Sequence, residues 1–321
     1  MKATAKLFRL LLSLYLAASA VAETIPANGK LKVFILAGQS NMVGFGQLDG
    51  SPGTMETYVK GNPKDYGQLV AKDGKRVVRD DVWIVNISDA QKPQQGWLTT
   101  GYGASEGHIG PEYGFGFVVG DAYEDPVLII KSAWGGRSLF HNFLSPGSEE
   151  YANPEKDGDK GFQYAEVLRH VKEITGDLKK YYPDYAGKGF EITGFGWHQG
   201  WNDRINEKFN NEYESNMANF IRDIRKDLNA PALPFVIAES GMTGPEEKHP
   251  RALSLMKAQG AVAQHAEFKG NVAFVGTRAF WRSKEESPNG QGYHWNCNAE
   301  TYYLIGEAMG EAMKRVIKEK K

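Results

Sequence analysis

Apolar residues recur along the chain in short continuous runs, and a polar or glycine-rich turn follows each run. Continuous rather than alternating apolarity is typical of strands that are covered on both faces, as in parallel sheets. The pattern therefore predicts five strands, within residues 32–38, 126–136, 190–200, 233–241 and 271–278.

Segments with apolar residues at helical spacing lie between these runs, for example residues 164–174, 217–228 and 305–316. The alternation of strand and helix predicts an α/β fold with a three-layer, doubly wound parallel sheet. Residues 47–108 fit the alternation poorly and contain one clear apolar island, VWIVNIS, at residues 82–88. We interpret them as a long insertion on the rim of the sheet, where loops commonly build substrate sites.

The first residues have the order of a secretory signal peptide. Lys2, Lys6 and Arg9 precede a short apolar stretch, and a small-residue cleavage site ends at Ala22. This order predicts a signal peptide at residues 1–22, followed by a secreted or periplasmic chain that forms a single domain. An uncleaved membrane anchor is the alternative, which the shortness of the apolar stretch disfavours.

The composition narrows the classes of partner. The formal net charge is −1 over 321 residues, and the basic residues form no long block, so nothing draws the chain to nucleic acid or to an anionic membrane. No later segment is long and apolar enough to cross a bilayer, so we expect no stable membrane insertion. Cys297 is the only cysteine, so no intrachain disulfide can form, and nothing positions it as a nucleophile.

Polar residues and glycines follow several of the predicted strands. Ligands bind outside the carboxyl ends of the strands in open parallel sheets, so we expect these residues to meet in one crevice. A hydroxyl, an imidazole, amide donors and flexible backbone are the groups that acyl transfer requires. The residues in question are Ser40 after the first strand, Trp134, Gly136 and Arg137 after the second, Gln199, Trp201 and Asp203 after the third, and His294 beyond the fifth.

The ordered set of blocks resembles the SGNH hydrolases, in the version found in the sialic-acid-specific acetylesterase and carbohydrate esterase family six group. The blocks are AGQSNMVGFG, GPEYGFG, SAWGGRSL, WHQGWND and GYHWN, which span the chain from the first strand to the C-terminal helix. The resemblance implies that Ser40 is the nucleophile and His294 the general base. It also implies oxyanion donors in the Gly136 N–H, with Gly135 as the nearby alternative, and in the Gln199 amide.

Two positions depart from the family pattern. Gln291 stands where the family often has an aspartate three residues before the histidine, and Trp201 replaces the glutamate usual in the third block. A glutamine can orient an imidazole but cannot stabilise an imidazolium as an anion does. Either the acid comes from elsewhere or the enzyme uses a Ser-His dyad. The candidate acids, in order of preference, are Asp203 and Glu239, with Glu112 and Glu300 as weaker choices.

Several aromatic and charged residues near these blocks are candidate sugar contacts. Trp201 is the preferred platform because it replaces a polar family residue, and Trp134 is a second candidate, although core packing is the more common role for each tryptophan. Arg137 is suited to anchoring a substrate carboxylate or hydroxyl, or to a surface ion pair. His198 has no partner at metal-ligand spacing, so we expect neither a metal nor a cofactor.

The sequence thus predicts a secreted serine esterase that removes O-acetyl groups from a carbohydrate, either an acetylated polysaccharide or sialic acid. A lipase or thioesterase on the same scaffold is one alternative, but long acyl chains need an apolar groove, whereas residues 47–108 are polar and aromatic. The other alternative is a carbohydrate-binding protein that has kept the fold and lost turnover. The missing acid at Gln291 favours that alternative, and the joint presence of Ser40, Gln199 and His294 disfavours it.

Overall fold

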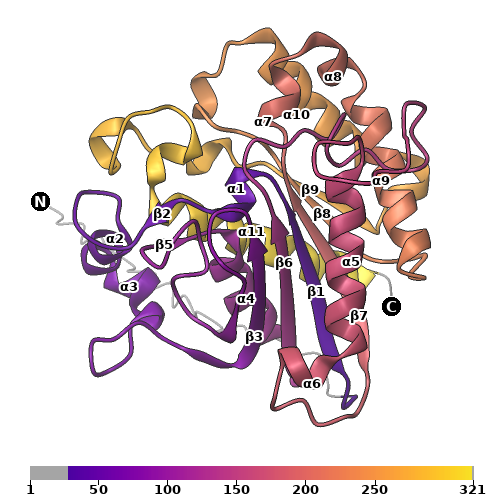
Figure 1. Cartoon of the computed structure of the whole chain (residues 1–321). Helices are drawn as coiled ribbons and strands as arrows, with labels where there is room; N and C mark the ends of the chain where they lie inside the picture. The colour runs from indigo at the N-terminus through magenta and orange to yellow at the C-terminus, as the bar shows by residue number, and fades with distance from the viewer. Residues whose placement is uncertain (1–27, 320–321) are drawn as a thin grey trace, which may run out of the picture.

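A seven-stranded sheet forms the centre of the molecule in the computed structural model, which describes residues 28–319 (Figure 1). The predicted signal peptide lies outside the described residues. The strand order is β4-β3-β6-β1-β7-β8-β9, and all neighbouring strands are parallel except β4, which pairs antiparallel with β3. The strands of this sheet are β1 (Leu31–Gly38), β3 (Arg79–Ser88), β4 (Gln94–Leu98), β6 (Val127–Ala133), β7 (Phe190–His198), β8 (Phe235–Ala238) and β9 (Val272–Val275). A separate two-stranded sheet contains β2 (Gly46–Gln47) and β5 (His108–Ile109).

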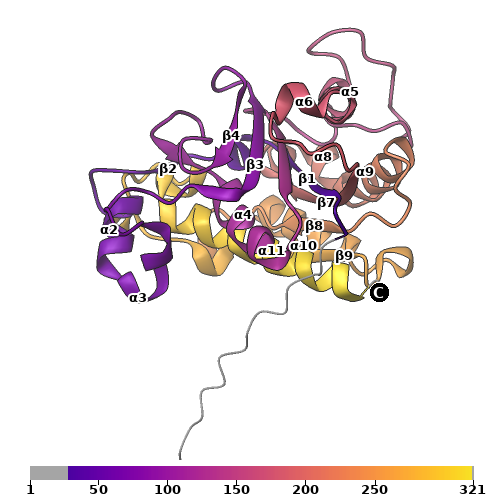
Figure 2. The same cartoon turned by 90° about the horizontal axis from the view of Figure 1, so that it is seen from below.

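Helices cover both faces of the sheet and complete a three-layer arrangement (Figure 2). Helices α4 and α11 pack on one face, and α5, α9 and α10 pack on the other. The helices are α1 (Ser40–Val43), α2 (Met55–Gly61), α3 (Pro63–Tyr66), α4 (Pro111–Ala122), α5 (Phe162–Gly176), α6 (Leu178–Tyr181), α7 (Trp201–Arg204), α8 (Glu207–Asn211), α9 (Tyr213–Asp227), α10 (Pro250–Val262) and α11 (Ala299–Glu319).

Strand β1 lies in the middle of the sheet, and every one of its residues is buried. All are apolar or glycine except Lys32, which pairs with Asp125. Its side chains alternate between the two cores, with Phe34 and Leu36 facing α4 and α11 and Val33 and Ile35 facing the opposite layer. The two-faced burial explains why its sequence reads as a continuous apolar run.

Glycines allow α4 and α11 to pack closely on one face of the sheet. A Cβ atom on Gly114 would lie 2.1 Å from the carbonyl oxygen of Tyr303, and one on Gly306 would lie 2.0 Å from that of Pro111. No side chain fits at these distances, so the absence of side chains at these positions sets the separation of the helices. Because α11 follows the loop that carries His294, its close packing on α4 anchors the end of that loop.

The predicted α/β fold and its parallel sheet are confirmed, with the antiparallel edge strand β4 as an addition. The expectation that residues 47–108 lie wholly on the rim is wrong for the apolar island. Residues 82–88 belong to β3, which pairs in parallel with β6 along its length. Their continuous apolarity is thus that of another covered strand. Strand β4, at the edge of the sheet, also comes from this region, and the remaining loops lie outside the seven-stranded sheet. Within residues 28–319, no helix is long and apolar enough to cross a membrane.

Candidate active site

Ser40 lies at the point where the central strand turns into a helix. Strand β1 ends at Gly38, Gln39 is extended, and Ser40 opens α1. A Cβ atom on Gly38 would lie 2.2 Å from the carbonyl oxygen of His198 on β7, so only glycine allows this close passage of the two strands. The Ser40 side chain is 8% exposed, and its position as the first helical residue leaves its N–H without an intrahelical acceptor.

A buried ion pair between Lys131 and Glu112 stabilises this turn. The ammonium group of Lys131, on β6, donates hydrogen bonds of 2.7 Å each to the carbonyl oxygens of Val43 and Tyr102 and to the carboxylate of Glu112. Both charged side chains are fully buried, and Glu112 also accepts a 2.7 Å bond from the N–H of Gly110. Burial raises the pKa of Glu112 and lowers that of Lys131, while their mutual attraction opposes both shifts. Glu112, a weak candidate for the catalytic acid, is therefore committed to Lys131.

The glycines after β6 follow the end of the strand that pairs with β1. The N–H of Trp134 donates to the carbonyl of Gly38, which joins the ends of β6 and β1. Gly136 has a φ of 62°, and a Cβ atom there would come no closer than 4.0 Å to another group, the Asn202 amide nitrogen. Among the described residues, no acceptor bonds the N–H of Ser40 or of Gly136. The N–H of Gly135, by contrast, is held by the Asp89 carboxylate at 2.9 and 3.0 Å.

Gln199 and Asp203 form a buried unit that holds the chain after Gly136. The Gln199 side-chain amide donates to the carbonyl of Arg137 at 3.0 Å and to Asp203 at 2.5 Å, and its own oxygen is buried without a partner. The Asp203 carboxylate also accepts the N–H groups of Leu139 and Phe140, both at 2.9 Å. Burial raises the pKa of Asp203 to about 6, against the effect of these hydrogen bonds.

Asp203 therefore binds the segment after β6 rather than His294. No hydrogen bond joins the two side chains in the described part of the chain, so the structure does not support Asp203 as the catalytic acid. Both hydrogens of the Gln199 amide are likewise engaged in this arrangement, so the predicted third oxyanion donor is not free.

His294 lies on a loop with unusual backbone geometry. Four consecutive residues, His294 to Cys297, have left-handed φ angles of 49°, 51°, 53° and 59°. The imidazole stacks on the ring of Phe45, with centroids 3.9 Å apart and planes at 7°, and Tyr293 contacts it edge-on. No described residue forms a hydrogen bond with this imidazole, and burial lowers its pKa to about 4. The ring is thus positioned by stacking alone.

The remaining candidate acids are committed elsewhere. Glu239 accepts the N–H of Thr277 at 2.9 Å and pairs with Arg278 at 3.2 Å. Glu300 is held by Arg282 and by the Tyr66 hydroxyl, each at 2.8 Å. Gln291 donates its side-chain amide to the carbonyl of Tyr293 and does not contact the imidazole. Of the two arrangements that the sequence allows, the geometry favours the dyad.

The three predicted sugar contacts have different surroundings. Trp201 is partly buried, and the guanidinium of Arg204 lies 3.4 Å from its ring centroid, so one face of the indole is already covered. Arg137 pairs with Asp157 at 3.1 Å. Trp134 is partly buried and stacks on His170 at a centroid distance of 5.8 Å.

Sequence reasoning missed three residues that shape the site. Phe45 was visible in the block AGQSNMVGFG, but only the fold shows that His294 stacks on it. The Asn202 side-chain amide donates to the carbonyl of Gly136 at 2.6 Å, and its backbone N–H donates to the Gln39 side chain at 3.3 Å. Asn202 therefore connects the segment after β6 to the turn that carries Ser40. Lys131 carried a readable signal, because a lone lysine within the apolar run PVLIIKSA needs a buried partner.

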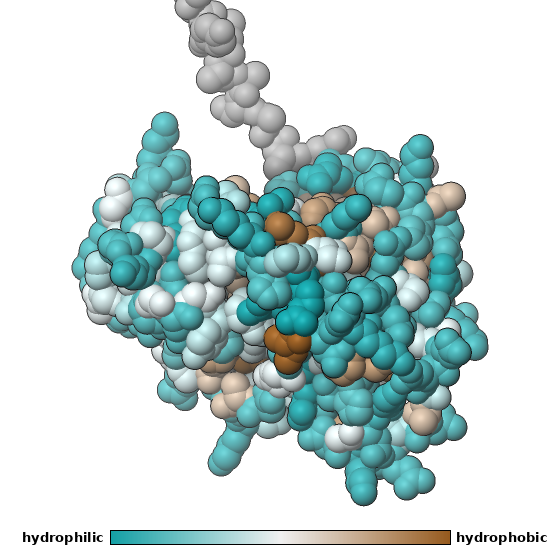
Figure 3. Space-filling view, turned by 90° about the horizontal axis from the view of Figure 1, so that it is seen from above, coloured by the Kyte–Doolittle hydropathy of each residue, from teal (hydrophilic) through white to brown (hydrophobic). Residues whose placement is uncertain are grey.

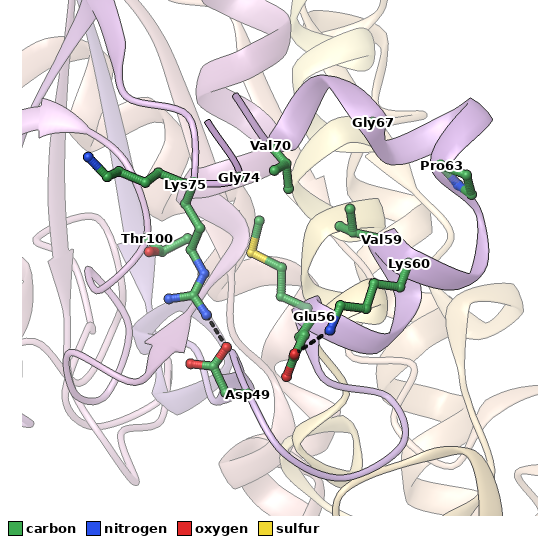
Figure 4. A pocket seen from close by; sticks show the side chains of 12 residues that line it. Asp49, Glu56, Val59, Lys60, Pro63, Gly67, Val70, Gly74, Lys75 and Thr100 are labelled. Atoms are coloured by element: carbon green, nitrogen blue, oxygen red, sulfur yellow. Dashed lines mark hydrogen bonds and ion pairs between the residues drawn. The ribbon is translucent and has the colours of Figure 1, made fainter. Parts of the chain in front are cut away.

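The loops of residues 49–76, with Thr100, line a separate cavity of about 920 Å³ (Figure 4). Its walls carry two ion pairs, Arg76 with Asp49 and Lys60 with Glu56, above apolar side chains that include Val59 and Val70. None of the predicted catalytic residues lines it. Among the described residues, no cluster of His, Cys, Asp and Glu side chains is arranged to hold a metal ion.

The comparisons with known proteins agree in fold and family. A family model described as carbohydrate esterase, sialic acid-specific acetylesterase matches residues 30–315. No curated protein matches the sequence.

Three solved structures share the fold. A protein of Arabidopsis thaliana is 17% identical with a TM-score of 0.56, and the match covers 88% of this chain and 97% of that one. A carbohydrate acetylesterase of Xanthomonas citri is 12% identical with a TM-score of 0.54, over 89% of this chain and 57% of that one. NanS is 15% identical with a TM-score of 0.50, over 81% of this chain and 83% of that one.

Proposed function

Because the chain belongs to the carbohydrate esterase family of sialic acid-specific acetylesterases, we propose that it is an exported serine esterase that removes O-acetyl groups from a carbohydrate through an acyl-enzyme. One observation carries the proposal. Among the described residues, two backbone N–H groups without an acceptor, those of Ser40 and Gly136, follow the ends of the neighbouring strands β1 and β6. Paired backbone donors next to a nucleophile are the arrangement that stabilises a tetrahedral oxyanion.

In the proposed reaction, the Ser40 hydroxyl attacks the acetyl carbonyl carbon and His294 accepts its proton. The N–H groups of Ser40 and Gly136 hold the oxyanion. The intermediate collapses as His294 returns the proton to the sugar oxygen, which leaves as a free hydroxyl and leaves acetyl-Ser40. His294 then deprotonates a water molecule that attacks this ester, and it gives the proton to the Ser40 oxygen as acetate departs.

A Ser-His dyad fits the surroundings of His294 better than a triad. A pKa of about 4 keeps the imidazole neutral at pH 7, which is the form that accepts a proton. No carboxylate is bonded to it, so the imidazolium formed during the reaction lacks the stabilisation that an anion provides. Catalytic hydrogen bonds often tighten only when substrate binds, so the missing Ser40–His294 bond is compatible with this role.

The surface around the site suits a polar substrate. Seen from the end of the molecule where α1 begins, the surface is mostly hydrophilic with a few small apolar spots (Figure 3). A lipase needs a continuous apolar surface for a long acyl chain, and this face carries none. The view therefore supports a short acyl group on a sugar.

The test is acetate release from acetylated xylan, O-acetylated sialic acid and p-nitrophenyl acetate. Ser40→Ala and His294→Ala should each lower kcat at least about a thousandfold, because loss of either member of the pair disables the attack. Ser51→Ala and His141→Ala serve as matched controls, since both lie outside the site, and they should retain wild-type rates. Equal rates in wild type and Ser40→Ala would refute the mechanism.

A carbohydrate-binding protein without turnover is the second candidate. It is favoured by one observation, namely that His294 has no hydrogen bond to Ser40 or to an acid among the described residues. Wild-type protein that binds acetylated xylan in calorimetry yet releases no acetate would establish this alternative.

Export is tested independently of activity. If the signal peptide is cleaved as proposed, N-terminal sequencing of protein from the periplasm or the medium should begin at Glu23. Protein that begins at Met1 in the membrane fraction would instead support the uncleaved anchor.

A further inference from the structure

Tyr293, the residue before the proposed base, is exposed to solvent. It is 44% exposed, and among the described tryptophans, tyrosines and phenylalanines the one other exposed residue is Phe190, at 36%. Phe190 begins β7, whereas the candidate site follows the carboxyl ends of the strands, so the two exposed rings lie at opposite ends of the sheet. Tyr293 is therefore the exposed aromatic side chain at the candidate site.

The backbone of Tyr293 is held in place although its ring is exposed. Its carbonyl oxygen accepts the N–H of Asn296 at 3.2 Å and the side-chain amide of Gln291 at 3.1 Å. The N–H of Gly292 donates to the Asn296 side chain at 2.9 Å, and the run of left-handed φ angles begins at the next residue, His294. Non-glycine residues keep such angles only where the surrounding structure compensates the cost. The loop thus presents the ring on a fixed backbone.

Ring contacts place Tyr293 at one end of a row of four rings that includes the proposed base. The centroids of Tyr293 and His294 are 4.9 Å apart, with planes at 76°, and those of His294 and Phe45 are 3.9 Å apart. Phe45 contacts His108 edge-on at 6.1 Å, and the Ser105 hydroxyl lies 2.7 Å from Nδ1 of His108. Each of the four rings is at least partly exposed. A molecule that packs on Tyr293 therefore lies next to the proposed base.

The tryptophans that the sequence predicts as sugar contacts have partners on their faces. The guanidinium of Arg204 covers one face of Trp201, and Trp134 stacks on His170. Both tryptophans are partly buried. Among the described residues, no ring is stacked on Tyr293, because its one ring contact, with the imidazole, is edge-on. Its exposed surface is therefore open to a ligand.

We propose that Tyr293 packs against the pyranose ring that carries the acetyl ester, and that it thereby selects sugar esters over acetyl esters of acyclic alcohols. The inference rests on the proposed function and names a specificity-determining residue of the same site. The C–H groups on one face of a pyranose form an apolar surface that packs on an aromatic face, while the hydroxyl groups at its rim remain in water. Packing on Tyr293 also brings the sugar oxygen toward His294, which returns the proton to it in the proposed reaction.

The test compares two acetyl esters of different alcohols, a monoacetylated methyl xyloside and monoacetylated glycerol, which has hydroxyl groups but no ring. Tyr293→Ala should lower the xyloside-to-glycerol ratio of kcat/KM about three- to tenfold, mainly through KM for the xyloside, because one aromatic packing contact is lost. Tyr293→Leu, which is apolar but has no flat face, should lower the ratio as well. Tyr293→Phe retains the ring and should keep the wild-type ratio.

Phe190→Ala is the matched control, since it removes the exposed ring at the other end of the sheet, and it should leave the ratio unchanged. An unchanged ratio in folded Tyr293→Ala protein, with thermal melting as the check of folding, would overturn the proposal. A wild type that shows no preference for the xyloside would overturn it too. Equal losses on both esters, with a moved pH midpoint of kcat/KM, would show that Tyr293 acts only through His294 and would likewise refute the sugar contact.

If the wild type hydrolyses neither ester, saturation-transfer NMR with methyl xyloside decides the binding claim, and the proposed function is judged separately on the acetylated glycans. Binding by the wild type that is lost in Tyr293→Ala and kept in Tyr293→Phe upholds the sugar contact. No binding by the wild type disproves it.

Discussion

The turn that carries Ser40 and the loop that carries His294 are built from different kinds of contact. Around Ser40, a buried ion pair bonds the backbone of α1 directly, and Gln199 and Asp203 hold the neighbouring segment after β6. Around His294, the backbone has left-handed φ angles, and the imidazole is held by a stacked ring and by no hydrogen bond among the described residues. The side of the proposed nucleophile is thus fixed by directional, charge-assisted bonds, whereas the side of the proposed base depends on packing.

This difference matters because no carboxylate forms a hydrogen bond with His294 among the described residues. Hydrogen bonds depend on both distance and angle, whereas aromatic pairs tolerate a wide range of offsets. A carboxylate on the imidazole would add both orientation and charge stabilisation. Its absence leaves Phe45 as the principal orienting contact, so variants on the two sides should fail in different ways.

The largest effect is expected when the ion pair beneath Ser40 is broken. Lys131→Met should lower the free energy of unfolding by about 3–5 kcal/mol, because it leaves Glu112 buried without a partner. Urea denaturation measures the loss. The double variant Lys131→Met/Glu112→Gln should recover a good part of it, since no charge is then buried, while Lys60→Met in an exposed pair should change nothing measurable. Equal losses in the single and double variants would contradict the ion-pair account.

Asp203→Asn should have a smaller effect on the same side. The new amide group would face the N–H donors of Leu139 and Phe140, which should cost about 1–3 kcal/mol of stability through lost hydrogen bonds. The pH dependence of kcat/KM should keep its wild-type midpoint, because Asp203 does not contact His294. Asp157→Asn, on the surface of the same region, is the control. A shifted midpoint would instead indicate that Asp203 acts on the base.

Phe45→Ala tests the base side. Removing the stacked ring should lower kcat about tenfold, a cost of about 1.4 kcal/mol, which is typical of a lost aromatic pair. His294 must be neutral to act as a base, so wild-type kcat/KM should fall as the pH drops through about 4. In Phe45→Ala the imidazole is better solvated, its pKa rises, and the fall should begin at a higher pH. Phe45→Tyr should retain the wild-type midpoint, and an unmoved midpoint in Phe45→Ala would show that the ring does not act on His294.

Gln291→Asp should have the smallest effect, and in the opposite direction. It restores the family's carboxylate near the imidazole, so kcat should rise about two- to fivefold and the pKa of His294 should rise, since an anion favours the imidazolium. Gln291→Asn is the neutral control of the same shape. A drop in kcat would mean that the bond from Gln291 to the Tyr293 carbonyl matters more than the added charge.

Short sequence blocks predicted where the candidate site residues lie in the fold, and the differences from the structure have physical reasons. Ser40, Gly136 and His294 follow strands or precede a helix, and local sequence marks such positions. Asp203 was placed near the correct strand end, but its carboxylate turns toward Leu139 and Phe140, which are remote in sequence. The direction of a side chain at a loop depends on which donors the tertiary fold brings near it.

By itself, the sequence determined the α/β class and five of the strands of the parallel sheet, because burial on both faces forces a continuous apolar run. It also predicted which groups follow the strand ends, a hydroxyl, an amide and glycines, and their chemical role stays a prediction. Only the tertiary structure decided that residues 82–88 join the sheet beside β6, that His294 stacks on Phe45, and that Asp203 accepts hydrogen bonds from Leu139 and Phe140. These facts depend on contacts between segments far apart in the chain, and no local pattern of residues specifies which distant groups will meet.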